Sequence, residues 1–339
     1  MDDPVRMAVV GVGYFGSRHA EKIARLPGAE LVAVADIDRG RAEAAGRAHR
    51  VPGLADPKAL LGRVDAVSVA VPTVAHFEVA SRFLDAGVHV LLEKPIAETP
   101  EAARRLIDLA ARRGAVLQIG HLERFSAPVL AIRDRISRPL YIESNRISAF
   151  QARGTDVNVI LEMMIHDIDL ILTLAGASIE SVDAVGAPVL SDVEDIANAR
   201  VRFANGAVAT ITASRVSTKA ERKLRVFQPD CYISIDFLDR TVRVVEKGKA
   251  KAGSDYPELS IETRSYQEVD ALAAEIAAFV SAVANGTPPL VGGEDGLKAL
   301  EAALMITRSL RAHWDRIGHG VPAGAAGTGP SPSARTAMG

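Results

Sequence analysis

The sequence predicts an α/β protein with two domains: a doubly wound parallel sheet, then a second α/β domain built on a large open sheet. In the first third of the chain, short apolar runs alternate with helical patterns, which is typical of a parallel sheet covered by helices on both faces. After Phe125, strand-like runs follow one another with few helices, which favours a mixed, mainly antiparallel sheet. We expect domains at residues 1–122 and 123–318, and a tail at 319–339.

Strands and helices alternate in order along the first domain. Continuous apolar runs mark the strands, because a strand buried on both faces shows no polar alternation. These runs are MAVVG, ELVAVAD, DAVSVAVP, VHVLLEKP and AVLQIG. Helical patterns follow the first three runs near residues 14–26, 39–48 and 75–86. A fourth helix is expected to begin at Thr99-Pro100-Glu101, which has the composition of a helix N-terminus.

The second domain combines a few helices with many strands. Helical patterns cover residues 127–136, 159–175, 269–285 and 296–311. Strands are expected in LYIESNRISAF, SVDAVGAPV, IANARVRF, AVATITASRVS, KLRVFQ, CYISIDF and TVRVVE. Asn205-Gly206 predicts a hairpin turn between two of them. We expect the C-terminal helices to pack back near the first domain, and the Gly/Ala/Pro/Ser-rich tail to be disordered.

Composition excludes several classes of protein. The 339 residues are 48% hydrophobic and 24% charged, which is ordinary for a soluble globular chain. The net charge is −2 and the basic residues are scattered, so neither nucleic acid nor a membrane is an expected partner. The acidic start MDDPVRMAVV does not resemble a signal peptide, and no apolar run approaches the ~18 residues of a membrane span. A single cysteine, Cys231, excludes an internal disulfide and fits the cytoplasm.

The turn GVGYFG directly after the first strand indicates a dinucleotide site. Glycines permit a tight turn and let the backbone approach a pyrophosphate at the N-terminus of the following helix. The pattern alone is weak evidence, but its place between a strand and a helix is that of a Rossmann domain. The expected cofactor-binding residues of this turn are Gly11, Gly13, Tyr14, Phe15 and Gly16.

Asp36 ends the second strand, at the distance from the glycine turn where an acidic residue binds the adenosine ribose hydroxyls. Its carboxylate would repel a 2′-phosphate, and Ile37-Asp38 follows without a basic pair. NAD is therefore favoured over NADP as the cofactor. Arg39 and Arg41 are close enough in sequence to keep NADP as the less favoured alternative.

Two other parallel strands end in polar residues at the same edge of the sheet, where ligands of open α/β sheets bind. Glu93-Lys94-Pro95 follows one strand, and proline favours an extended backbone at Lys94 that would direct its side chain into the cleft. The sequence VAVPTVAH ends the neighbouring strand. The cofactor-site residues expected at this edge are Pro72, Thr73, His76, Glu93 and Lys94, with a structural role as the alternative for His76.

The segment LEMMIHDIDLIL places charged residues in an otherwise apolar helix. On a regular α-helix Glu162, His166 and Asp169 share one narrow sector, and Asp167 alone lies on the far side. Buried carboxylates are costly unless they are paired or face a wet cavity. Three explanations are open: a catalytic stripe, a metal site, and a structural stripe satisfied internally. A metal site is disfavoured because no second His/Cys cluster completes a coordination sphere, so no metal is expected.

A catalytic stripe would meet Lys94 across the cleft between the domains. Alcohol oxidation requires a group that takes the hydroxyl proton, and the ordinary histidine pKa of ~6.5 suits His166. The Lys94 ammonium would polarise the oxygen and stabilise a developing alkoxide. These residues therefore provide the parts for proton and hydride transfer.

VGVGYFG, the EKP triplet and the helical ExxxH pattern together closely resemble the glucose–fructose oxidoreductase/inositol dehydrogenase (Gfo/Idh/MocA) family. The resemblance covers nearly the whole chain up to the tail, including NGTPPLVGGEDGLKALEAALMI. It implies a Rossmann domain followed by an α/β domain whose open sheet often mediates homodimers or homotetramers. It also implies that Lys94 is the catalytic lysine and His166 the catalytic base. Members commonly have Asp where this chain has Glu162, which would bind substrate, orient His166 or mark a different substrate.

GHLERF and DVNVILEMMIHDIDLIL are similar to one branch of this family. That branch oxidises the 3-hydroxyl of UDP-N-acetylglucosamine to a ketone, which a partner aminotransferase converts to an amine for modified lipid A. The branch has Asn after GHxERF, where this chain has Ser126-Ala127-Pro128. The resemblance favours a nucleotide-sugar substrate. The candidate substrate-binding residues are Arg124, Arg153, Glu162 and Asp169, of which the two arginines suit a diphosphate and have surface ion pairing as their alternative role.

Two other functions remain compatible with the sequence. One is a dehydrogenase of inositol or another free sugar or polyol, because the loops that form the substrate pocket cannot be assembled from one sequence. The other is an NAD-binding sensor without turnover, which the joint presence of Lys94 and His166 disfavours.

Overall fold

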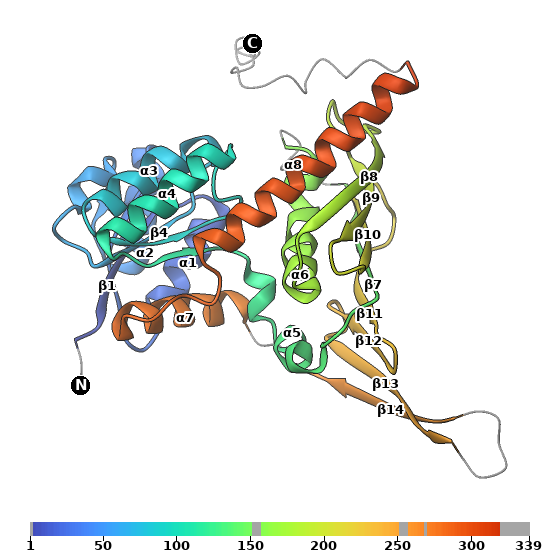
Figure 1. Cartoon of the computed structure of the whole chain (residues 1–339). Coiled ribbons are helices and arrows are strands. Elements are labelled where there is room, and N and C mark those ends of the chain that lie inside the picture. Colours follow the sequence, from blue (N-terminus) through green and yellow to red (C-terminus); the bar gives the residue numbers. More distant parts are fainter. Residues whose placement is uncertain (1–2, 151–156, 251–256, 268–269, 319–339) are drawn as a thin grey trace.

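The structure, a computed structural model, describes residues 3–150, 157–250, 257–267 and 270–318. It contains two separate sheets, each with its own helices, and one long helix that reaches from the first sheet to the second (Figure 1). The expected disordered tail at 319–339 and the candidate Arg153 lie outside the described residues.

The first sheet is six-stranded and parallel, in the order β3-β2-β1-β4-β5-β6. Its strands are β1 (Val5–Val10), β2 (Ala29–Ala35), β3 (Gly53–Leu54), β4 (Ala66–Val69), β5 (His89–Leu92) and β6 (Leu117–Ile119). The connecting helices are α1 (Tyr14–Ile23), α2 (Arg39–His49), α3 (His76–Asp85) and α4 (Pro100–Arg113). The doubly wound sheet is confirmed. Its strand order reverses between β1 and β4, which opens a crevice at the carboxyl ends of the strands.

The second sheet has eight strands in the order β14-β13-β12-β11-β7-β10-β9-β8. Its strands are β7 (Tyr141–Ile147), β8 (Ile179–Ala187), β9 (Ile196–Phe203), β10 (Val208–Ser214), β11 (Glu221–Phe227), β12 (Cys231–Asp236), β13 (Thr241–Ala250) and β14 (Pro257–Ser265). Among the described strands, β7 and β10 pair in parallel and the other neighbours are antiparallel. The expected mixed, mainly antiparallel sheet is confirmed. The sequence did not predict β14, because most residues of this edge strand are exposed and polar.

Helices cover one face of the second sheet and tie it to the first domain. They are α5 (Ala127–Ile132), α6 (Ile165–Ala175) and α8 (Gly293–Arg316). The start of α8 packs Leu297 into the core of the first sheet, and its later turns pack Ile306 and Leu310 into the core of the second. The helix α7 (Ala271–Asn285) packs Phe279 against the first sheet, so the C-terminal helices do return to the first domain as expected. Within the described residues, none of the helices is long and apolar enough to cross a membrane.

Candidate active site

The glycine turn between β1 and α1 has the geometry of a pyrophosphate cradle. Gly11 has a φ of +87°, and a Cβ there would lie 2.6 Å from the Ala70 carbonyl oxygen. A Cβ on Gly16 would lie 1.7 Å from the Gly11 oxygen, so neither position accepts a side chain. A Cβ on Gly13 would meet nothing within 4 Å, and Gly13 caps α1 without a side-chain hydrogen bond. The first turn of α1 is therefore open to an anion, which fits a bound dinucleotide.

The Asp36 carboxylate, directly after β2, binds the backbone of this glycine turn. It accepts hydrogen bonds from the backbone N–H of Val12 at 2.9 Å and of Asp38 at 2.8 Å. The Arg41 guanidinium lies 3.1 Å from the same carboxylate. Asp36 thus positions the glycine turn in addition to its expected role at the ribose.

Tyr14 is half exposed at the start of α1. Phe15 packs edge-to-face against the Tyr14 ring, with ring centroids 5.2 Å apart, and is also half exposed. At the end of β4, Pro72 is exposed and Thr73 is partly buried. His76 is buried, and its ring nitrogens lie 2.8 Å from the Pro95 carbonyl oxygen and 3.0 Å from that of Val71. His76 therefore joins the end of β4 to the loop after β5, which is the structural role that the sequence left as its alternative.

Glu93 is part of a buried hydrogen-bonded chain that starts inside the first sheet. His19 Nδ1 lies 2.8 Å from the Ser68 hydroxyl, and His19 Nε2 lies 3.0 Å from the Glu93 carboxylate, within hydrogen-bonding distance of each. Burial opposes ionisation of Glu93, but this hydrogen bond and the charges of His19 and Lys94 outweigh it and lower the pKa of Glu93. Glu93 is therefore an anion that sits directly beside Lys94.

Lys94 reaches the second domain. Its peptide bond to Pro95 is cis. Its Nζ donates a hydrogen bond to the backbone carbonyl of Glu162 at 2.7 Å. Burial lowers the pKa of Lys94, against the opposing charges of Glu93 and Glu162. The structure thus brings together two residues that are far apart in the sequence, as the catalytic stripe required.

The stripe itself differs from the prediction in its local geometry. Residues Ile160–Met164 form a π-helix, and the regular α6 begins only at Ile165. Because a π-turn contains an extra residue, Glu162 is rotated away from the sector expected on a regular helix. Its carboxylate pairs with Arg215 at 2.8 Å. Arg215 also binds the buried Asp195 at 2.8 Å, so Glu162 belongs to an ion-pair network with the second sheet.

The two aspartates of α6 are buried and paired with arginines. Asp167, expected alone on the far side, accepts from Arg146 at 2.7 and 3.2 Å. Arg146 also contacts Glu123 at 3.0 Å. These pairs supply the partners that buried carboxylates require, and the charge of Arg146 also acts on His166 and Lys94.

Asp169 has a similar partner, which holds α6 to the segment that follows β6. It accepts two hydrogen bonds from Arg124, at 2.7 and 2.6 Å, and Arg124 also lies 3.2 Å from Asp295 at the start of α8. Two of the expected substrate-binding residues thus pair with each other. The charge of the Arg124 guanidinium is already balanced by two carboxylates.

His166 lies at the start of α6 with its Nδ1 buried and without a hydrogen-bond partner among the described residues. Burial, the charge of Lys94 and the charge of Arg146 hold its pKa well below 6.5. A neutral imidazole next to a lysine suits a general base. The position and protonation of His166 are compatible with the catalytic role that the sequence assigned to it.

A second histidine, His121, was not among the predicted site residues. It follows β6 at the ligand-binding edge of the sheet, is 1% exposed, and neither ring nitrogen has a partner among the described residues. Burial lowers its pKa, and the charges of Asp169, Arg124 and Lys94 act on it. It also contributes to the low pKa of His166. Its signal was present in the GHLERF motif, where a histidine directly follows an apolar strand.

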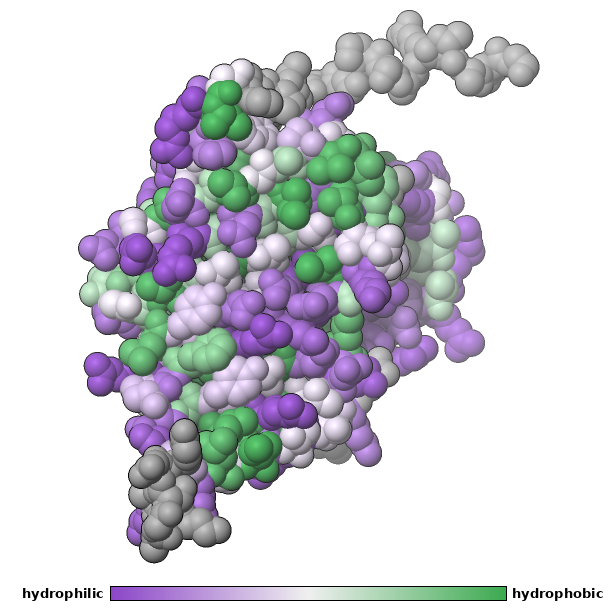
Figure 2. All heavy atoms as spheres, turned by 90° about the vertical axis from the view of Figure 1, so that its right-hand side faces the viewer, coloured by the Kyte–Doolittle hydropathy of each residue, from purple (hydrophilic) through white to green (hydrophobic). Residues whose placement is uncertain are grey.

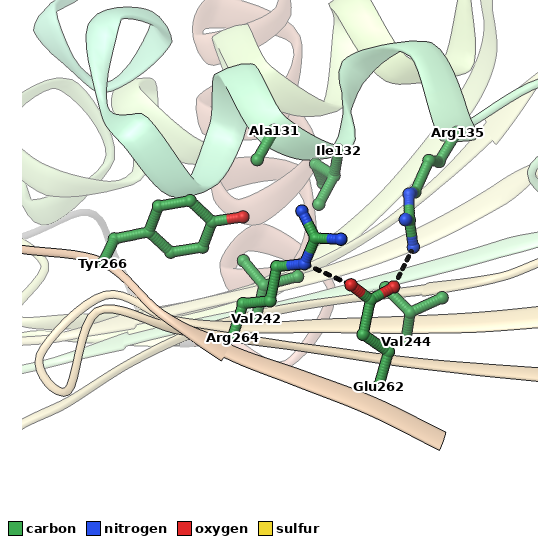
Figure 3. Close-up of a pocket in the computed structure, with 8 residues that line it drawn as sticks. All are labelled: Ala131, Ile132, Arg135, Val242, Val244, Glu262, Arg264 and Tyr266. Carbon is green, nitrogen blue, oxygen red and sulfur yellow. Dashed lines mark hydrogen bonds and ion pairs between the residues drawn. The ribbon is translucent and has the colours of Figure 1, made fainter. Parts of the chain in front are cut away.

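Another pocket of the second domain lies apart from these residues. It lies between α5 and the strands β13 and β14, where Glu262 forms ion pairs with Arg135 and Arg264 (Figure 3). Its volume of about 20 Å³ suits roughly one water molecule. None of the predicted site residues lines it, and it is too small for a cofactor or a sugar.

The fold and the site together define an NAD-dependent oxidoreductase. A sequence model described as "Oxidoreductase family, NAD-binding Rossmann fold" matches residues 5–121, and one for the "GFO/IDH/MocA C-terminal domain" matches residues 129–233. The chain therefore belongs to the GFO/IDH/MocA oxidoreductase family, and NAD is its cofactor. The family and the cofactor expected from the sequence are both confirmed.

Relatives with known activities cover almost the whole chain. It is 38% identical over 313 residues to UDP-N-acetylglucosamine 3-dehydrogenase of Acidithiobacillus ferrooxidans, which covers 92% of this chain and 99% of that protein. It is 27% identical over 331 residues to scyllo-inositol 2-dehydrogenase (NAD(+)) of Bacillus subtilis, with 92% and 95% covered. A solved structure of the Acidithiobacillus ferrooxidans enzyme has a TM-score of 0.85 at 37% identity, and covers 91% of this chain and 98% of that one.

Proposed function

We propose that this protein oxidises the 3-hydroxyl of UDP-N-acetylglucosamine to the 3-keto sugar. The observation that carries the proposal is the 38% identity to an enzyme named for this reaction, over 92% of the chain and through both domains. The placement of Lys94 against the helix that bears His166 supports the same class of chemistry. The proposal agrees with the substrate branch that GHLERF resembles.

Two side chains carry the proton and charge movements of this reaction in our proposal. His166 takes the proton of the reacting hydroxyl, because its low pKa leaves the imidazole unprotonated at neutral pH. Lys94 donates a hydrogen bond to the same oxygen and stabilises its negative charge while the C–O bond becomes a C=O bond. NAD, when bound, accepts the hydrogen that leaves the carbon with its electron pair.

Supporting residues hold this pair in place in our proposal. Asp36 and the glycine turn bind the adenosine ribose and the pyrophosphate of the cofactor. Glu93 keeps a negative charge beside Lys94 and so favours its ammonium form. Glu162 positions the catalytic lysine through its backbone carbonyl, and its side chain is fixed by Arg215.

A dehydrogenase of inositol or another polyol is the second candidate. It is favoured by the 27% identity to scyllo-inositol 2-dehydrogenase over nearly the same part of the chain. The roles of Lys94 and His166 would be the same, because the chemistry at the reacting carbon is the same. The two candidates differ in whether the substrate carries a nucleoside diphosphate.

We also propose the cellular setting expected from the sequence. The single cysteine and the small net charge fit a cytoplasmic enzyme with small-molecule partners. A 3-keto nucleotide sugar is a substrate for an aminotransferase, which would place the product on a route to modified lipid A. A detergent-free cell fraction that holds both activities would support this setting.

We further propose that the second sheet mediates a homodimer or homotetramer. In the part of the chain that the structure describes, no other element covers the face of this sheet opposite the helices, and apolar patches alternate with polar ones on it (Figure 2). On this face the rings of Tyr141, Phe227 and Tyr232 pack against one another at tilted angles, with centroids 5.5 and 5.0 Å apart. The apolar side chain of Ile261 is 64% exposed on the same face. Such exposed apolar surface is typical of a protein interface.

The deciding assay follows NADH absorbance with purified protein, NAD and UDP-N-acetylglucosamine, beside UDP-glucose, free hexoses and inositol. Oxidation of a secondary alcohol by NAD is unfavourable near neutral pH, so a ketone trap or an aminotransferase is included. Turnover confined to UDP-N-acetylglucosamine supports the proposal, and turnover of a free polyol alone contradicts it. His166→Ala is expected to bind NAD normally but to lose turnover. Unchanged activity of that variant would remove His166 from the mechanism.

A further inference from the structure

Arg222 lies close enough to His166 for its charge to act there, in a position that neither the sequence motifs nor the mechanism explains. It lies in β11 directly opposite Arg146 of β7. Side chains alternate between the two faces of a strand, so Arg222 shares the face of Leu224 and Val226. Both of these residues are buried in the core beneath the helices. Arg222 therefore lies on the helix-covered face, beyond the end of the apolar core, where its side chain is exposed.

The other arginines around this site are already paired with carboxylates. Arg146 binds Asp167 and Glu123. Arg124 and Arg215 each contact two further carboxylates, at distances from 2.6 to 3.2 Å. Within the described part of the chain, no hydrogen bond or ion pair joins the Arg222 guanidinium to another residue. An unpaired guanidinium at a cleft is available to an anionic ligand.

The surroundings of Arg222 carry charges of both signs. Its cross-strand neighbour Arg146 has the same charge, and like charges at directly opposed positions destabilise a sheet. Burial and the charge of Arg146 lower the pKa of Arg222, against the opposing charges of Glu123 and Asp167. Arg222 in turn is one of the charges that lower the pKa of His166, so its charge acts at the reacting end of the cleft.

We propose that Arg222 binds a phosphate of the substrate's diphosphate and thereby selects nucleotide sugars over uncharged polyols. This inference rests on the proposed function. In a nucleotide sugar the diphosphate and the reacting hydroxyl are carried by the same sugar ring, so a phosphate ligand must lie near the catalytic base. The planar guanidinium fork binds phosphate oxygens in pairs. An uncharged polyol offers no anionic group to pair with this guanidinium.

The test compares Arg222→Gln with Arg222→Lys and with a matched control, Arg225→Gln. Arg225 lies in the same strand but on the opposite face, where it pairs with Glu143. Binding of UDP to the NADH-saturated protein is measured by calorimetry, and KM for UDP-N-acetylglucosamine by NADH absorbance. Arg222→Gln is expected to weaken UDP binding and to raise KM, each by roughly 10- to 100-fold. This is the effect expected from the loss of one charge-assisted hydrogen bond. Arg222→Lys is expected to lose less, and Arg225→Gln to be unchanged.

The outcomes separate this inference from the proposed function. Normal NAD binding by Arg222→Gln shows that the variant is folded. A selective loss of UDP binding in that variant then supports the role of Arg222. Equal UDP binding and equal KM in wild type and Arg222→Gln would overturn the role of Arg222 and leave the nucleotide-sugar proposal standing. If the wild-type protein neither binds UDP nor turns over UDP-N-acetylglucosamine, both proposals are overturned together.

Discussion

At the residue scale, the protonation of His166 is determined by its surroundings. Burial disfavours the imidazolium form most, and the charges of Lys94 and Arg146 disfavour it further. Burial also lowers the pKa of Lys94. A base must be unprotonated and an ammonium must be protonated, so both forms exist together only between the two lowered pKa values.

This arrangement predicts a bell-shaped pH dependence of kcat/KM. The acid limb is expected below the ordinary histidine value of 6.5, because a lowered pKa keeps His166 unprotonated at lower pH. The alkaline limb is expected below the ordinary lysine value of 10.5, because a lowered pKa makes Lys94 lose its proton sooner. Initial rates across this range give both limbs, and NAD binding at each pH controls for unfolding. An acid limb at or above 6.5 would contradict the assignment of His166.

Asp36 provides a second prediction at this scale. Asp36→Ala removes the expected ribose ligand and releases Arg41, which now lies 3.1 Å from the carboxylate. We expect NAD to bind roughly 10- to 100-fold more weakly, as for lost hydrogen bonds to a charged group, and NADP to lose much less. Fluorescence titration with both cofactors measures the ratio. Arg39→Ala is the control, because Arg39 is exposed and pairs only with Glu43 among the described residues. Equal losses for both cofactors would contradict the ribose assignment.

At the element scale, α6 and the π-turn before it connect the two domains. The turn presents the Glu162 carbonyl to Lys94. One turn later, Asp167 binds Arg146 of β7, and Asp169 binds Arg124 in the segment that follows β6. His166 therefore lies between contacts that fix the chain before it, at Glu162, and after it, at Asp167 and Asp169. A π-turn of this kind is common at functional sites because it re-aims groups without ending the helix.

The buried pair between Asp167 and Arg146 should contribute strongly to stability. Asp167→Ala leaves the Arg146 charge buried with one carboxylate fewer, which is expected to lower the free energy of unfolding by about 3–5 kcal/mol. Urea unfolding followed by circular dichroism measures this loss. Asp134→Ala is the control, because Asp134 is 89% exposed and its ion pair should contribute little. A loss below about 1 kcal/mol for Asp167→Ala would show that the pair adds little to stability.

At the scale of the whole molecule, the open face of the second sheet provides the prediction on assembly. Ile261→Lys places a charge at an exposed apolar position of this face, where it cannot disturb a core. We expect the wild-type protein to elute as a dimer or tetramer. We expect the variant to dissociate at a higher protein concentration than wild type, because a charge in an apolar interface must be desolvated. Light scattering coupled to size exclusion measures the mass. Leu130→Lys on α5, at a similarly exposed position, is the control.

A monomeric wild-type protein at micromolar concentration would contradict the proposed assembly. Equal masses for Ile261→Lys and wild type across a dilution series would place the interface elsewhere. Neither result would affect the catalytic proposal, because Lys94 and His166 both belong to the same chain.

The sequence by itself determined the features that depend on neighbours along the chain. The parallel sheet followed from the alternation of apolar runs and helices, since a doubly covered strand has no polar positions. The glycine turn and Asp36 followed from their place after β1 and β2. Family resemblance carried the catalytic pair, Lys94 and His166. These signals are local in sequence, so one chain was enough to find them.

Only the tertiary structure decided which charges meet. Arg124 suited a diphosphate in sequence, yet the fold places it against Asp169 and Asp295. His121 and Arg222 carried no periodic signal, because their significance arises from neighbours on other elements, such as Asp169 for His121 and Arg146 for Arg222. The π-turn likewise cannot be read from spacing that assumes a regular helix. Pairing between distant residues depends on how the two domains pack, and that packing is not encoded in any short stretch of the chain.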